Sequence, residues 1–82
     1  MNRSEQAIIS AISRGELLKS HREVDGSKMF RLHQADGRWQ SVSAKDVRRL
    51  RTAGLIDSNK KFPVATFWLT EIGRSPVAAQ NR

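Results

Sequence analysis

The chain has 82 residues and a mass of 9.3 kDa, with fifteen Lys and Arg against eight Asp and Glu, a net charge of +7 and no cysteine. This length allows one domain with one core, and the lack of cysteine excludes disulfides, a thiolate nucleophile and cysteine-ligated zinc. The longest apolar runs are three residues, far short of the roughly 20 of a membrane helix, so we expect a soluble, cytoplasmic protein without a signal peptide.

The first predicted helix covers about residues 4 to 14. Asn2 or Ser4 can cap its start, and Gly15 is the expected stop after the last turn. The apolar residues recur at intervals of three and four, as in a helix with one buried face: Ala7, Ile8, Ile9, Ala11 and Ile12.

Two Asp-Gly pairs, at 25–26 and 36–37, predict a meander of three antiparallel strands at about 17 to 24, 28 to 34 and 38 to 42. Asp-Gly favours a two-residue type I′ hairpin turn. Such a turn places His21 opposite Phe30 and His33 opposite Leu18, on opposite faces and about 10 Å apart along the strands.

The second predicted helix covers residues 44 to 53, with Ser43 as its N-cap and Gly54 after its end. A rotation of about 100° per residue gives it two faces. Val47 and Leu50 point to one side, whereas the opposite side carries Lys45, Arg48, Arg49 and Thr52, with Arg51 at the boundary.

A basic loop from Ser58 to Lys61 precedes a strand that begins near Pro63 and contains Phe67 and Trp68, of which one faces the core and the other faces out. Thr70 can cap a last turn over residues 71 to 74. We therefore expect one domain over residues 1–74 and a C-terminal tail over 75–82.

Little in the chain suggests catalysis. His21 and His33 are the two imidazoles, and their predicted separation excludes a shared metal ion or proton. Nucleophile and metal-ligand motifs do not occur. We expect no enzyme activity, no catalytic residue, no metal and no cofactor.

The aromatic residues number five, with no Tyr. Without paired aromatic motifs, a sheet that stacks RNA bases is disfavoured. An exposed Trp39 or Trp68 would instead indicate a protein or self-association surface.

The basic residues are organised, because six of them lie between Lys45 and Lys61 with two acidic residues. Arg also outnumbers Lys ten to five, which suits bidentate contact with phosphates and base edges. A helix fits the DNA major groove, so a cationic outer face can meet both phosphates and guanine edges.

The second half of the sequence resembles a winged helix domain. The matching residues are Gly54, Leu55 and Ile56 in the turn after the recognition helix, Asn59 to Lys61 at the wing tip, and Leu69, Thr70, Glu71, Gly73 and Arg74 at the exit from the wing. The resemblance covers about 30 residues, and it implies that the helix enters the major groove while Lys60 and Lys61 touch the backbone or minor groove.

A standard winged helix domain has another helix where this chain has the two Asp-Gly hairpins. The layout of helix, meander, recognition-like helix and wing also looks like that of the small YjhX-type toxin family. The expected fold is thus α+β, a winged helix variant with a β-meander between its first helix and its recognition-like helix.

These observations predict a small transcriptional regulator that binds double-stranded DNA through the helix 44–53 and the wing near 58–62. The expected DNA-binding residues are Ser43, Lys45, Arg48, Arg49, Arg51, Thr52, Lys60 and Lys61. The alternative is a phage or mobile-element inhibitor or toxin that acts on a host protein or nucleoprotein complex. The sequence leaves a homodimer open, and salt dependence separates the two functions.

Overall fold

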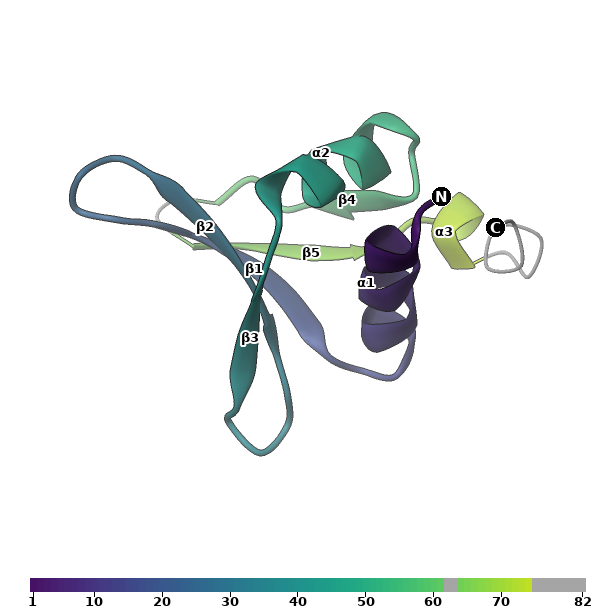
Figure 1. Ribbon diagram of the computed structural model, residues 1–82, viewed down its shortest axis with the longest axis horizontal. Coiled ribbons are helices and arrows are strands. Elements are labelled where there is room, and N and C mark those ends of the chain that lie inside the picture. The colour runs from purple at the N-terminus through teal and green to yellow at the C-terminus, as the bar shows by residue number, and fades with distance from the viewer. Residues whose placement is uncertain (62–63, 75–82) are drawn as a thin grey trace.

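The computed structural model describes residues 1–61 and 64–74, and over these it has the predicted α+β class (Figure 1). Three helices accompany one antiparallel sheet of five strands in the order β3-β2-β1-β5-β4. The elements are α1 (Arg3–Ser13), β1 (Leu17–Arg22), β2 (Lys28–His33), β3 (Trp39–Val42), α2 (Ala44–Thr52), β4 (Ile56–Ser58), β5 (Val64–Leu69) and α3 (Glu71–Arg74). The predictions for Phe62, Pro63 and the tail 75–82 lie outside the described residues.

Helix α1 begins one residue earlier than predicted because Asn2, rather than Ser4, is its cap. The Asn2 side chain accepts a hydrogen bond from the Glu5 backbone at 2.7 Å, and Glu5 accepts one from the Asn2 backbone at 3.1 Å. This reciprocal pair satisfies two amide groups that a helix start otherwise leaves open. Gly15, with φ +103°, ends the helix as predicted.

Both Asp-Gly pairs lie in hairpin loops, but each loop has three residues instead of two. In the first loop, the Glu23 amide donates to Ser27 O at 2.8 Å, and Gly26 adopts φ +90°. The Asp25 side chain accepts bonds from the Ser27 amide and hydroxyl. These bonds lower the pKa of Asp25. The 36–37 loop repeats this pattern, with Gln34 donating to Arg38 O at 2.7 Å.

The longer loops shift the strand register by one residue, so the predicted pairing is wrong. Ser20, not His21, pairs with Phe30, and Leu18 pairs with Leu32. Because the side chains of a strand alternate between the two faces of a sheet, a shift of one residue in the pairing moves every side chain of that strand to the other face relative to its partner. His21 and His33 therefore share one face of the sheet, contrary to the prediction.

Helix α2 follows the prediction closely, with Ser43 as its N-cap and Gly54 in the left-handed region after its end. The Ser43 hydroxyl accepts a bond from the Lys45 amide at 3.2 Å. Val47 and Leu50 are fully buried. The 3.6-residue period alone determines these two faces, independently of any strand register.

Hydrogen bonds of Thr70 join α3 to the turn between α2 and β4. The Thr70 hydroxyl donates to Gly54 O at 2.5 Å and accepts from the Gly73 amide at 3.1 Å, which confirms its predicted capping role. The Thr70 amide donates to Leu55 O. Gly73 lies so close to Leu55 that an added Cβ would stand 2.0 Å from Leu55 O. The Leu-Thr-x-x-Gly-Arg segment is thus a packing motif here.

The core lies between one face of the sheet and helices α1 and α2, which both cover that face (Figure 1). Its buried apolar residues come from both helices and from four strands: Ile8, Ile9, Ala11, Leu18, Leu32, Val47, Leu50, Ile56, Ala65, Phe67 and Leu69. Phe67 is buried and Trp68 is exposed, as predicted for adjacent strand residues. Among the residues that the structure describes, none forms a helix long and apolar enough to cross a membrane.

Candidate nucleic-acid interface

The outward side of α2 is open to solvent along its whole length. Lys45, Arg48, Arg49 and Thr52 are all exposed, and so is Arg51 at the edge of this side. In residues 1–61 and 64–74 the ion pairs are Arg14–Glu16, Arg31–Glu23 and Arg38–Asp36, so none of the α2 cations is held in an ion pair there. The meander does not cover the predicted DNA-binding face of the helix.

The loop after β4 presents Lys60 and Lys61 beside α2. The Asn59 side chain organises it by accepting bonds from the amides of Lys61 and Thr66 at 3.1 and 3.2 Å. Lys60 has φ +55°, a left-handed conformation that Gly or Asn adopts more readily. This backbone holds two exposed lysines next to each other at the end of the β4–β5 hairpin.

Two hollows lie beside α2, and one of them also contains the loop lysines. One, of about 190 Å³, has Ser20 and Ser58 near its floor, and its basic residues are Arg22, Lys28, Arg51, Lys60 and Lys61. The other, of about 360 Å³, is lined by Lys28, Arg48 and Arg51 around Val47 and Phe67. Neither hollow has a carboxylate in its lining.

We call the continuous set of exposed cations the basic surface. It holds eight of the fifteen Lys and Arg side chains: Arg22, Lys28, Lys45, Arg48, Arg49, Arg51, Lys60 and Lys61. Cations gathered around hollows that no carboxylate lines attract polyanions more strongly than the same charges dispersed over the molecule. The structure therefore brings together all six predicted cations.

Arg22 and Lys28 belong to the basic surface but not to the predicted site. They pair across the first hairpin, and both point to the sheet face that α2 covers. The signal was present in the sequence, because two basic residues flank the Asp25-Gly26 loop on opposite strands. The correct three-residue loop length was needed to place them on this face.

Ser43 and Thr52 differ in what they offer a ligand. The Ser43 hydroxyl accepts the capping bond from Lys45, but its side chain is exposed at the helix start. Thr52 lies with Lys45, Arg48 and Arg49 around a shallow apolar surface at Ala53. Thr52 is on the open side of α2 with the cations, as predicted, whereas Ser43 lies on the opposite side of the helix start, where it lines a cleft with Asp46.

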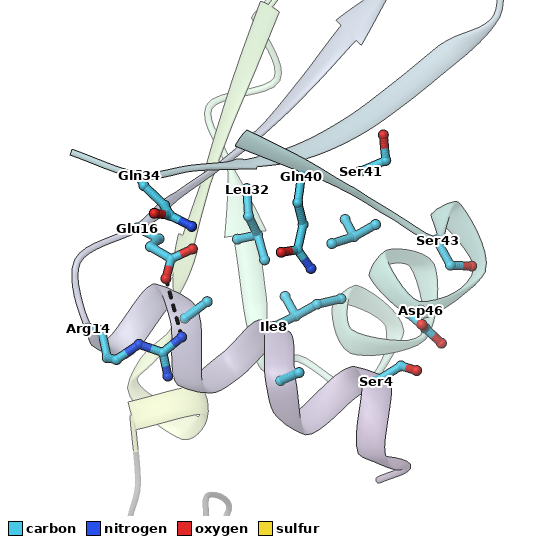
Figure 2. A pocket seen from close by; sticks show the side chains of 13 residues that line it. Ser4, Ile8, Arg14, Glu16, Leu32, Gln34, Gln40, Ser41, Ser43 and Asp46 are labelled. Carbon is cyan, nitrogen blue, oxygen red and sulfur yellow. Dashed lines mark hydrogen bonds and ion pairs between the residues drawn. The ribbon is translucent and has the colours of Figure 1, made fainter. Parts of the chain in front are cut away.

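A different cleft of about 390 Å³ lies between α1, β3 and the start of α2 (Figure 2). Its charged lining residues are Arg14, Glu16 and Asp46, and Arg14 pairs with Glu16 at 3.2 Å. Amide and hydroxyl side chains, including Gln34 and Gln40, supply most of the remaining polarity. With two acids and one base, this cleft lacks the positive charge that a polyanion requires.

The two histidines meet on the sheet face that the helices leave open. His21 Nε2 and His33 Nε2 lie 3.4 Å apart, which corrects the predicted separation. Burial lowers the pKa of His33 from its ordinary value of 6.5, and the neighbouring charges of His21, Lys19 and Arg31 lower it further. No group of three His, Asp or Glu side chains in the described ranges is arranged to hold a metal ion.

Comparison of the chain with models of known protein families, with curated proteins and with solved structures finds no match.

Proposed function

We propose that the protein binds double-stranded DNA through the basic surface and acts as a small transcriptional regulator. The observation that carries this proposal is the continuity of eight cations over α2, the 59–61 loop and the first hairpin, around hollows that no carboxylate lines. A helix of ordinary width fits the major groove, and arginines on its outer side can contact phosphates and guanine edges. Lys45, Arg48, Arg49 and Thr52 supply this outer side.

The elements beside α2 also suit such a contact. After the turn at Gly54, β4 and β5 form a hairpin, and β5 pairs with β1. Helix, turn and hairpin follow in the order that the winged helix resemblance implies, and Lys60 and Lys61 lie next to the helix. Lys60, Lys61, Arg22 and Lys28 then meet the phosphates that flank the groove.

The β2–β3 hairpin precedes α2 where a standard winged helix domain has a helix. The short connection from Val42 through Ser43 to α2 fixes the helix against the end of this hairpin. The hairpin thus sets the angle of α2, and we expect the angle of docking to differ from that of a standard winged helix domain.

Salt dependence tests the proposal. Fluorescence anisotropy of a labelled 30-base-pair duplex is followed from 50 to 300 mM salt. With about four to six phosphates contacted, log affinity falls against log salt with a slope of about −4 to −5. The Arg48→Ala/Arg49→Ala variant weakens binding by at least about tenfold and makes the slope shallower by about two.

A matched control variant shows whether binding depends on the position of the lost arginines or only on the net charge of the protein. The Arg14→Ala/Arg38→Ala variant loses the same two charges, but both residues lie outside the basic surface in ion pairs with Glu16 and Asp36. It retains affinity within about twofold. Equal weakening in both variants, or no binding at 50 mM salt, contradicts the proposal and favours the alternative of an inhibitor or toxin that acts on a host protein.

A further inference from the structure

The sheet face opposite the helices carries an unusual set of exposed side chains. Trp39 and Trp68 are 49% and 42% exposed, and no described element covers them. The large exposed apolar residues on this face come from four strands: Leu17, Met29, Trp39, Val64 and Trp68. This face lies on the other side of the sheet from α2 and the basic surface.

Strand register arranges part of this face as a row of rings. Trp39 pairs with His33, and His33 pairs with Leu17. Because Leu18 pairs with Phe67, the next position along β5 places Trp68 beside Leu17. Trp39, His33, Leu17 and Trp68 thus form one line across four strands, and the two tryptophans stand about 14 Å apart at the usual strand spacing. We call this line the aromatic row.

A second line of side chains runs parallel to the aromatic row, two residues further along each strand. Its members are Ser41, Arg31, Lys19 and Thr66, which pair with one another across the sheet. We call it the cationic row. The spacing between the two rows is about 7 Å.

Arg31 links the two rows. Its guanidinium lies over the Trp39 ring, 4.2 Å from the ring centre, and about half of the Trp39 side chain stays exposed. Arg31 also pairs with Glu23 at 3.6 Å, but its Nε is buried and has no hydrogen-bond partner. This face therefore combines aromatic rings for stacking with an arginine that has an unused hydrogen-bond donor.

Two occupants other than nucleic acid fit this face less well. In a symmetric dimer centred on the cationic row, Lys19 and Arg31 of both copies approach each other, and of these only Arg31 has a carboxylate partner, Glu23, so like charges disfavour that contact. An apolar protein surface would cover the rings but leave Lys19 without a partner and the Arg31 Nε without a hydrogen bond. A single strand of nucleic acid supplies flat bases and phosphates together.

We propose that this face binds single-stranded DNA, with bases stacked on Trp39, His33 and Trp68 and with phosphates at Lys19 and Arg31. DNA is the better fit, because Leu17 at the middle of the aromatic row offers no hydrogen-bond partner for a ribose 2′-hydroxyl. This inference goes beyond the proposed duplex binding and uses different residues.

Tryptophan fluorescence gives a direct measurement, since Trp39 and Trp68 are the only tryptophans in the chain. When an oligothymidylate of twelve nucleotides is titrated into the protein at 50 mM salt, we expect saturable quenching of this fluorescence, with a dissociation constant in the micromolar range. In anisotropy with the labelled oligonucleotide, Trp39→Ala/Trp68→Ala loses affinity by at least about tenfold. Trp39→Phe/Trp68→Phe, which keeps two rings, stays within a few-fold of the unaltered protein.

Further variants separate this site from the basic surface. Arg48→Ala/Arg49→Ala keeps oligothymidylate binding, whereas Lys19→Ala weakens it and leaves duplex affinity unchanged. Circular dichroism checks that each variant is folded. The proposal is overturned by the absence of quenching, by equal affinity of the alanine double variant, or by an oligouridylate that binds as tightly. A dimer in sedimentation that the alanine double variant dissociates would assign the face to self-association instead.

Discussion

At the scale of single residues, Gly73 is the glycine with the least space for a side chain, because it packs against the Leu55 backbone. A Cβ at position 73 would lie 2.0 Å from Leu55 O and 3.0 Å from its carbonyl carbon, so backbone must move to accept it. We expect Gly73→Ala to lower the free energy of unfolding by about 2–4 kcal/mol. Thermal unfolding followed by circular dichroism then shows a Tm lower by at least about 8 °C.

Gly37→Ala is the control for this substitution. Gly37 has φ +92° but no atom within 4 Å of an added Cβ, so alanine meets only the left-handed penalty of about 1–2 kcal/mol. A Gly73→Ala protein that is no less stable than Gly37→Ala would contradict the packing role of Gly73.

His33 predicts a dependence of stability on pH. Its pKa in the folded protein is below the ordinary 6.5, because of burial and then the charges of His21, Lys19 and Arg31. As the pH falls through 6.5, the unfolded chain binds the proton first, and the stability that neutral His33 provides is progressively lost down to the folded-state pKa. Above 6.5 this contribution is complete.

Urea denaturation at pH 7.5 and pH 5 measures this effect. We expect the unfolding midpoint to fall on acidification, and to fall less in His33→Gln, which cannot take up the proton. An identical pH dependence in both proteins would show that His33 is not responsible.

At the scale of elements, Ser43 caps the start of α2, the helix that we propose binds DNA. Ser43→Asp keeps a good N-cap and suits the helix dipole, so stability is retained, whereas Ser43→Ala costs about 1 kcal/mol. A negative charge added at the start of the helix that we propose binds DNA should weaken duplex binding several-fold. Asn2→Asp adds the same charge at the α1 cap and should leave the affinity unchanged. If Ser43→Asp and Asn2→Asp bind equally well, the start of α2 does not lie near the DNA.

Helix α2 and the first hairpin show how far the sequence predicts this molecule. The faces of α2 follow from its own period, so Val47 and Leu50 were predicted inside and the cations outside without knowledge of any neighbour. Strand faces depend on loop length as well. Asp-Gly occurs in both two- and three-residue loops, and the choice between them rests on bonds such as Glu23 to Ser27.

The difference of one residue in loop length explains which surface residues the sequence analysis placed wrongly or left out. It reverses the face of His33 relative to His21, and it determines that Arg22 and Lys28 join the basic surface. The aromatic row also requires the β1–β5 pairing, which joins segments almost 50 residues apart in sequence. No local pattern encodes such a contact.

At the scale of the whole molecule, the sheet separates two surfaces of different composition. The basic surface carries exposed cations around α2, and the opposite face carries the aromatic and cationic rows. If both proposals hold, the two ligands bind independently. We expect a saturating duplex to leave oligothymidylate quenching unchanged within about twofold, and full displacement by the duplex would mean that both share one surface.

The most direct test of duplex binding by the basic surface is a titration of the ¹⁵N-labelled protein with a short duplex, followed by amide chemical shifts. We predict that the shifts concentrate at residues 43–53 and 58–61 and at Arg22 and Lys28, and that residues 39–41 and 66–68 stay in place. Shifts confined to residues 39–41 and 66–68, or none at low salt, would contradict the account.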